Sequence, residues 1–315
     1  MKWQNSAPSN IALIKYMGKN NTELNIPSNS SLSYTLNHLR STVELELTTE
    51  RTDLWQPFPD NEIILSDKEQ NRYLKHLNLL KQYFNINDHF IVRSKNNFPA
   101  GCGLASSAAS FAALTQCAAD AFKQLNLDKF KQLNINSQIL SSLSRQGSGS
   151  SCRSFFSPWA LWRDDHAEAV SLPYPELIHH TVVLSREKKS ISSSEAHRQV
   201  TTSSLFDGRA ERAEKRLTQL IQSFTEKDWK NAYIICWQEF WDMHALFETC
   251  ATPFTYLTPA SLAVLNYLRD YWQLTQDGPI VTMDAGPNVH LLFRPEQTRI
   301  IDQIVTELRK QYFII

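Results

Sequence analysis

Glycine is scarce in this sequence, and its distribution is uneven. The 315 residues include 8 glycines, whereas an average usage of about 7% would give roughly 22. Six of the 8 lie in four short polar segments, at Gly18, 101–103, 147–149 and Gly286. Because glycine permits positive φ and close approach of the backbone, we expect these segments to form turns or to contact a ligand.

The sequence also lacks an excess of charge of either sign. Lys and Arg together number 32, and Asp and Glu together number 32. A balanced chain has no broad basic surface that would attract nucleic acid or an anionic membrane, so we predict neither as a partner. An anionic small molecule must therefore be bound by a local cluster of cationic side chains.

Cysteine patterns and long apolar runs are missing as well. The five cysteines are odd in number and widely spaced, and they show no Cys-x-x-Cys or zinc-binding spacing. We interpret them as reduced thiols and predict a cytoplasmic protein, since the first six residues contain no apolar segment of a secretory signal. The most apolar run, 105–122, is interrupted by polar residues, which favours a buried helix over a membrane span.

Hydrophobic periodicity predicts a chain of mixed strands and helices. The expected helices cover 68–84, 105–122, 135–145, 207–248, 260–273 and 296–311, and the expected strands cover 42–49, 89–93, 159–162, 180–185, 280–283 and 289–293. A segment with two prolines, 173–175, suggests a boundary between lobes of residues 1–175 and 176–315. The order of elements favours an α+β fold with helices packed on sheets. We interpret His244, inside the predicted helix 207–248, as structural.

The segment 96–109 begins as a loop with Asn, Pro and two glycines and ends as the start of a helix. A glycine-bearing loop that leads into a helix N-terminus directs backbone N–H groups and partial positive charge at one point, which suits a phosphate. It is not a Walker loop, because no Lys follows Gly103, and Ser106 stands where a Rossmann motif needs its last glycine. Ser106 and Ser107 are candidate ligands of phosphate or Mg²⁺, and a simple capped helix is the alternative.

Three further segments carry cations or a carboxylate in unusual surroundings. Lys15 follows the apolar run Ile11–Ile14, a context in which a cation needs an anionic partner. Arg153 is surrounded by hydroxyls in the segment 147–154, and a guanidinium binds phosphate or carboxylate through two N–H groups. The alternatives are a solvated lysine and a Ser/Gly linker. Residues 186–194, basic and then serine-rich, fit either an anion site or a solvated loop.

Together these segments resemble one known family. Residues 99–108 are similar to the phosphate loop of the GHMP small-molecule kinase superfamily. Within it, residues 7–19, 26–33, 145–154 and 283–288 resemble the diphosphomevalonate decarboxylase family, in the expected order and over both predicted lobes. The resemblance implies the GHMP kinase fold, an α+β fold with a ribosomal protein S5-like N-terminal lobe, a left-handed β-α-β unit, and an α+β ferredoxin-like C-terminal lobe. It also implies a homodimer.

The activity implied by the resemblance is ATP-dependent decarboxylation of mevalonate 5-diphosphate to isopentenyl diphosphate, with Mg²⁺. ATP would phosphorylate the tertiary 3-hydroxyl, and loss of that phosphate with CO₂ would form the alkene. The resemblance assigns catalysis to Lys15, Arg153 and Asp284, of which Asp284 would hydrogen-bond the 3-hydroxyl. It assigns substrate binding to Tyr16, Lys19, Ser148, Ser150, Ser192 and Ser193. It assigns nucleotide binding to Ser94, Asn96, Pro99, Gly101, Gly103, Leu104, Ala105, Ser106 and Ser107, with Ser106 and Ser107 also at the metal.

Several positions depart from the family pattern. They are Met17, Asn20, the triplet 195–197, which ends in His197, and the pair 101–102. Two alternatives therefore stay open at this point. One is a related GHMP enzyme that acts on mevalonate or its monophosphate, as a 3-kinase, a phosphomevalonate kinase or a phosphomevalonate decarboxylase. The other is a catalytically silent nucleotide sensor. An Asp before Gly-Pro, as at Asp284, is also common in plain turns.

Overall fold

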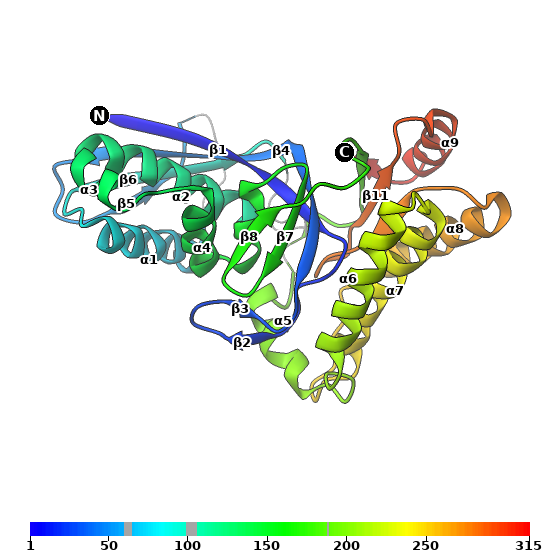
Figure 1. Cartoon of the computed structure of the whole chain (residues 1–315). Coiled ribbons are helices and arrows are strands. Elements are labelled where there is room, and N and C mark those ends of the chain that lie inside the picture. Colours follow the sequence, from blue (N-terminus) through cyan, green and yellow to red (C-terminus); the bar gives the residue numbers. More distant parts are fainter. Residues whose placement is uncertain (60–64, 99–105, 188) are drawn as a thin grey trace.

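The computed structural model describes residues 1–59, 65–98, 106–187 and 189–315. Two lobes lie side by side (Figure 1), each built on one main sheet. Part of the predicted phosphate loop and one lysine of the predicted anion segment lie outside the described residues. They are Pro99, Gly101, Gly103, Leu104, Ala105 and Lys188.

Two long strands run through the first lobe. They are β1 (Lys2–Ala12) and β4 (Ser31–Thr48), which pair antiparallel with a register shift between Pro8 and Ser9. β4 is one strand of 18 residues, so the predicted strand 42–49 is only its second half. As its alternation predicts, Val43 and Leu45 are buried, whereas Glu44 and Glu46 are partly exposed.

The rest of this sheet is assembled on β4. The strand order is β5-β6-β4-β7-β8, with β1 pairing to β4 beside this path. The added strands are β5 (Leu54–Gln56), β6 (His89–Asn96), β7 (Trp159–Arg163) and β8 (His166–Ala169). The helices that the described residues of this lobe form are α1 (Asp67–Phe84), α2 (Ser106–Leu125), α3 (Leu127–Gln132) and α4 (Ser137–Gly147). Apolar side chains of α1 and α2 form one core with Val43, Leu45 and Val92 of the sheet.

The second lobe holds a four-stranded antiparallel sheet in the order β10-β11-β9-β12. Its strands are β9 (Ile178–Val183), β10 (Ile280–Thr282), β11 (Val289–Phe293) and β12 (Phe313–Ile314). Its long helices are α6 (Arg209–Thr225), α7 (Trp229–Glu248), α8 (Pro259–Thr275) and α9 (Thr298–Arg309). A short helix, α5 (Ser193–Gln199), and the 3₁₀ turn η2 (Val200–Thr202) lie beside the hairpin of β2 (Lys19–Asn21) and β3 (Ile26–Pro27) in Figure 1.

The prediction of one continuous helix over 207–248 is wrong. The chain turns between α6 and α7, where Lys227 adopts a left-handed conformation with φ 59°. Asp228 then starts α7, because its side chain accepts a hydrogen bond from the Asn231 N–H as an N-cap. Each half carries an apolar stripe in helical spacing, so periodicity alone does not reveal the break.

One hydrophobic core joins the two lobes. Ile11, Leu13 and Ile14, at and after the end of β1, pack in the same cluster as residues of α6, α7 and β11. The end of β1 is therefore inserted between the lobes, and the residues that follow it lie at their junction. This placement decides where the candidate site forms.

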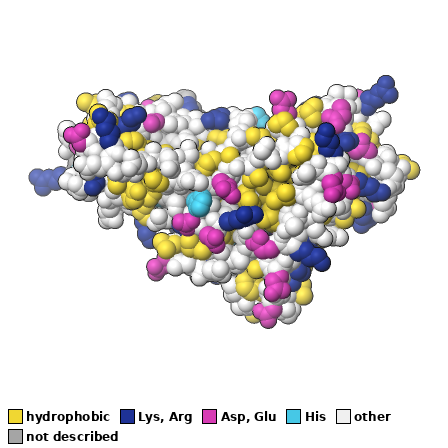
Figure 2. Space-filling model, in the orientation of Figure 1, with side chains coloured by type: hydrophobic (Ala, Val, Ile, Leu, Met, Phe, Trp, Pro, Cys, Tyr) yellow, Lys and Arg dark blue, Asp and Glu magenta, His cyan; other side chains and the backbone are white. Residues whose placement is uncertain are grey.

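The surface agrees with the balanced composition. On the face in Figure 2, cationic and anionic side chains are interspersed, with hydrophobic side chains between them. Within residues 1–59, 65–98, 106–187 and 189–315, no helix is both long enough and apolar enough to cross a membrane.

Candidate active site

A buried ion pair lies at the junction of the lobes. The Lys15 Nζ is 2.7 Å from Oδ1 of Asp284, and it also donates to the Ala12 carbonyl at 2.6 Å. The Lys15 side chain is 2% exposed, whereas that of Asp284 is 26% exposed. The anionic partner predicted for Lys15 is therefore present, 269 positions away in sequence, and its carboxylate remains open on one side.

The two charges hold each other in the ionised form. Burial by itself raises the pKa of the Asp284 carboxyl, but the Lys15 ammonium, with His290 and Arg153, outweighs it and lowers this pKa below its usual value. Burial lowers the pKa of Lys15, and the Asp284 carboxylate offsets this only in part. At neutral pH Asp284 is a carboxylate, so it accepts hydrogen bonds and cannot donate one.

Arg153 adds a second buried cation. It lies on the 3₁₀ turn η1 (Gly149–Phe155), is 4% exposed, and its Nε donates to Oδ1 of Asn10 at 3.1 Å. Asn10 is itself fixed through a hydrogen bond to the Ser154 hydroxyl. Among the described residues, the Arg153 Nη1 has no hydrogen-bond partner. A buried donor without a partner is costly unless a ligand satisfies it.

Tyr16 presents a similar donor. Its hydroxyl is buried and has no partner in the part of the chain that is described, and burial raises the pKa of the phenol, so the proton stays on it. The ring packs on Trp162 with centroids 4.5 Å apart, and a Cβ at Gly149 would lie 2.7 Å from it. The glycine at 149 is therefore needed for close approach, as its position in a polar segment suggests.

The segment 147–154 is not a linker. Most of η1 is buried, and the Ser148 hydroxyl lies 3.4 Å from that of Ser107 in the first turn of α2. Ser150 contributes its carbonyl to Asn10 at 3.3 Å. The start of α2, with Ser106 and Ser107, thus adjoins the Arg153 segment, and the phosphate-binding and substrate-binding predictions converge on one place.

Ser94 and Asn96 are placed differently. Both lie on β6, where the buried Ser94 hydroxyl accepts from the Trp55 indole at 3.2 Å and Asn96 accepts from the Ser41 hydroxyl. These bonds tie β6 to its neighbours. A role of either residue at a nucleotide stays a prediction.

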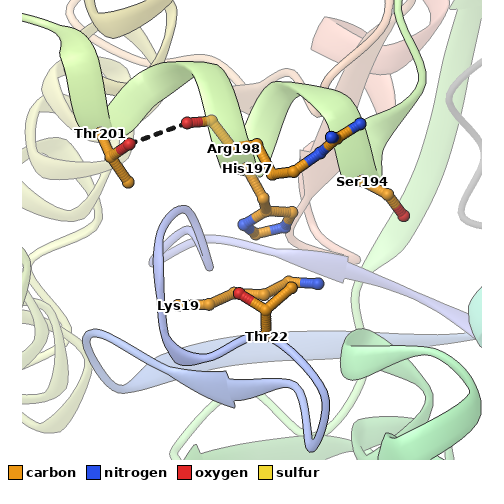
Figure 3. A pocket seen from close by; sticks show the side chains of 6 residues that line it. All are labelled: Lys19, Thr22, Ser194, His197, Arg198 and Thr201. Carbon is orange, nitrogen blue, oxygen red and sulfur yellow. Dashed lines mark hydrogen bonds between the residues drawn. The ribbon is translucent and has the colours of Figure 1, made fainter.

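The serine-rich segment reaches the site from the second lobe. Lys189 donates to the Ala285 carbonyl, next to Asp284, and to the Ser193 hydroxyl at 3.1 Å. The Ser192 side chain caps α5 by accepting from the Glu195 N–H. On the opposite wall, the Lys19 Nζ donates to Oδ1 of Asn25 at 2.6 Å. Figure 3 shows Lys19 facing α5 across a pocket.

Comparison with known proteins identifies the family. The family model described as diphosphomevalonate decarboxylase-like N-terminal domain matches residues 7–173. The model described as mevalonate 5-diphosphate decarboxylase C-terminal domain matches residues 180–313. The chain belongs to the diphosphomevalonate decarboxylase family.

Individual family members agree with this assignment. A mevalonate diphosphate decarboxylase from Legionella pneumophila is 48% identical with a TM-score of 0.93, and each chain covers 100% of the other. The protein MDDEF, solved in complex with MVAPP, AMPPCP and magnesium, is 30% identical with a TM-score of 0.88, over 100% of this chain and 96% of that one. The diphosphomevalonate decarboxylase mvd1 of Aspergillus fumigatus is 33% identical over 94% of this chain and 78% of its own length.

These findings confirm the predicted family, the decarboxylase class and the two-lobed α+β fold. They also show that the family member MDDEF binds ligands of the predicted kinds, a phosphorylated substrate, an ATP analogue and magnesium. For the present chain, the roles assigned to individual site residues stay predictions.

The Mg²⁺ prediction was tested against the donors present. In the described ranges, no three His, Cys, Asp or Glu residues gather as metal ligands. Mg²⁺ commonly keeps several waters and binds through one or two protein oxygens plus substrate phosphates. The hydroxyls of Ser106 and Ser107 at the start of α2 are oxygen donors of the right type beside a phosphate site, so these residues fit such a metal.

Four residues of the site were missed by sequence reasoning. Asn10 fixes Arg153, Glu239 accepts from the Lys15 N–H at 2.9 Å, and Arg209 donates to the Lys15 carbonyl at 3.4 Å. His244 was interpreted as structural, yet its Nε2 lies 3.2 Å from the Asp284 carbonyl and so donates to it. A polar residue inside an apolar strand or helix was the available signal for Asn10, Glu239 and His244, whereas Arg209 begins a highly charged helix and gave no such signal.

Proposed function

We propose that this chain catalyses ATP-dependent decarboxylation of mevalonate 5-diphosphate to isopentenyl diphosphate, ADP, phosphate and CO₂. The observation that carries the proposal is the open carboxylate of Asp284, held ionised by the buried Lys15 and by the nearby Arg153 charge. Arg153 and Tyr16 also carry donors that have no partner among the described residues. Family membership and the ligands of MDDEF support the substrate and ATP.

Asp284 acts first on the substrate hydroxyl. Its carboxylate accepts the hydrogen bond of the tertiary 3-hydroxyl and orients that oxygen toward the γ-phosphorus of ATP. The hydroxyl proton passes to Asp284 as the new O–P bond forms and the bond to ADP breaks. His244 donates a hydrogen bond to the Asp284 backbone carbonyl. The carboxylate is therefore already in place before the reaction begins.

Lys15 and Arg153 act on the substrate carboxylate and on the phosphate that leaves. Two cations face one protein carboxylate, which leaves one positive charge for the substrate. Departure of the 3-phosphate with its electron pair and loss of CO₂ form the double bond, and the proton held by Asp284 returns to the phosphate. Tyr16, Lys19, Ser148, Ser150, Ser192 and Ser193 bind the rest of the substrate in this proposal.

ATP occupies the side of the site formed by the start of α2. Ser106 and Ser107, together with the ATP phosphates, would hold Mg²⁺. The metal would supply charge neutralisation during phosphoryl transfer. We further propose that residues 1–175 and 176–315 form the two functional lobes and that the protein is a cytoplasmic homodimer. The dimer rests on the family resemblance, and the four described cysteines, all buried and free, support a reducing compartment.

A product assay tests the proposal. The protein is incubated with ATP and Mg²⁺ and, in separate reactions, with mevalonate, its 5-monophosphate or its 5-diphosphate. We expect ADP, CO₂ and isopentenyl diphosphate in equal amounts from the diphosphate. ADP without CO₂ would indicate a kinase, preference for the monophosphate would reassign the substrate, and tight binding without turnover would indicate a sensor.

A further inference from the structure

A pocket of about 170 Å³ lies between the β2–β3 hairpin and α5. It is lined by Lys19, Thr22, Ser194, His197, Arg198 and Thr201 (Figure 3). All six side chains carry hydrogen-bonding groups and none is acidic. A half-enclosed space with cationic and neutral donors and no carboxylate in its lining suits an anion.

The tautomer of His197 is determined by its backbone neighbour. The Gly18 N–H donates to Nδ1 of His197 at 3.1 Å, so Nδ1 carries no proton. Burial, with a smaller effect of the Lys19 charge, lowers the pKa of His197 to about 3, so the ring is neutral at physiological pH. A neutral ring with a bare Nδ1 must carry its proton on Nε2. Figure 3 shows the imidazole directed at Lys19 and Thr22.

That Nε2–H is available for a ligand. His197 is 9% exposed, and within the described part of the chain Nε2 has no hydrogen-bond partner. Lys19 lies across from it as an ammonium, which has three donors, and Asn25 accepts one of them. No ion pair joins Lys19 to a carboxylate of the described residues.

A row of packed side chains links the pocket to the proposed active site. The Tyr16 ring packs on His197 with centroids 4.2 Å apart and on Trp162 at 4.5 Å. The Arg153 guanidinium lies 5.5 Å from the centroid of the same Trp162 ring. Asp284 and the pocket thus lie at two ends of one wall. The carbon that bears the 3-hydroxyl of the substrate belongs at Asp284, and the diphosphate of the substrate belongs in the pocket.

We propose that His197 is a specificity-determining residue, which donates from Nε2–H to the diphosphate of the substrate and completes, with Lys19, its binding pocket. This inference rests on the proposed function, since it names how the same substrate is recognised at its far end. The neutral donor suits the place, because burial and the nearby Lys19 charge both disfavour a protonated imidazole at His197. Arg198 adds less, since it is largely exposed and paired with Glu195.

Two variants separate the two nitrogens of His197. In His197→Asn, Oδ1 replaces Nδ1 as the acceptor for Gly18, and the donor toward the pocket is lost. In His197→Gln, the amide N–H₂ reaches the position of Nε2 and restores the donor. The matched control is Thr225→Val on α6, outside the pocket lining, because the exposed Thr225 hydroxyl donates to the Ile221 carbonyl of its own helix at 2.8 Å.

Inorganic diphosphate is the first probe, because its binding requires no turnover. We expect titration calorimetry to show that His197→Asn weakens its affinity on the order of 10-fold to 100-fold, the effect of one hydrogen bond to a charged group. His197→Gln recovers most of the loss, and Thr225→Val changes the affinity less than twofold. Nitrogen-15 NMR of labelled histidine should show a protonated Nε2 that shifts when diphosphate binds.

The second probe is the substrate itself. With mevalonate 5-diphosphate, His197→Asn is expected to raise KM by a similar factor and leave kcat within about twofold, as loss of binding common to ground and transition state predicts. Equal diphosphate affinity in His197→Asn and the wild type, or a proton on Nδ1, would overturn the inference. Diphosphate binding that depends on His197 in a protein without decarboxylase activity would instead overturn the proposed function alone.

Discussion

Two groups of buried charges lie next to each other in space, and they differ in whether their carboxylates are fully hydrogen-bonded. The first is the catalytic pair, Lys15 and Asp284. The second is the α6–α7 network, in which Arg209, Arg212 and Arg216 of α6 bind Glu239 and Asp242 of α7. Glu239 is 0% and Asp242 8% exposed, and each accepts from two arginines. The pair has an open carboxylate, whereas both carboxylates of the network are filled; the one donor of the network without a partner among the described residues is the Arg209 Nε.

The difference separates a functional from a structural use of charge. A network whose carboxylates are fully hydrogen-bonded and shielded from water stabilises the packing of its helices. Removing one member leaves buried cations unpaired. A pair with an open carboxylate beside unsatisfied donors is ready for a ligand. The two groups are also linked, because Glu239 accepts from the Lys15 N–H and Arg209 donates to the Lys15 carbonyl. The network thereby positions the segment after β1 that carries the catalytic lysine.

The largest expected effect comes from neutralising the open carboxylate. Asp284→Asn should lower kcat about 10³- to 10⁴-fold, because the hydroxyl loses its proton acceptor. Its cost in unfolding free energy should be smaller than that of the network variant below, since the site is partly solvated and the Asn oxygen still accepts from Lys15. Steady-state kinetics and urea unfolding measure the two quantities, with ATP affinity as the control. Near-normal turnover would remove Asp284 from catalysis.

The same amide change in the closed network should reverse the pattern. Glu239→Gln turns an N–H₂ group toward Arg209 or Arg216 and should lower the free energy of unfolding by roughly 3–5 kcal/mol. At a temperature where the variant is folded, kcat should fall far less than in Asp284→Asn. If Glu239→Gln instead lost activity without losing stability, the network would belong to the catalytic machinery and the contrast would fail.

The smallest effect concerns the pH dependence of kcat/KM. The pKa of Lys15 is lowered by burial, so its proton is lost as pH rises through a value below that of a free lysine, and the basic limb should lie there. The Glu239 charge raises this pKa, so Glu239→Gln should move the basic limb to still lower pH. Asp284, whose pKa is lowered, remains ionised well into the acid range, which leaves the profile flat from neutral pH down to about pH 5. An unshifted basic limb in the variant would show that the two groups are not coupled electrostatically.

Much of this could be predicted from local sequence patterns. Alternation predicted the burial of Val43 and Leu45, and the apolar surroundings of Lys15 predicted an anionic partner. Motif resemblance predicted the family and the decarboxylase class. The break at 226–228 was missed, because apolar stripes in helical spacing lie on both sides of it and the positive φ of a lysine has no clear local signal.

The sequence by itself determined the family, several of the secondary elements and the need of buried cations for anions, because these depend on residue type and short-range spacing. Only the tertiary structure decided which charges meet. Asp284 reaches Lys15 because the end of β1 is inserted between the lobes, and Gly18 sets the tautomer of His197 because the β2–β3 hairpin lies against α5. Such contacts join residues more than a hundred positions apart, and local periodicity specifies the face of an element but not its partner.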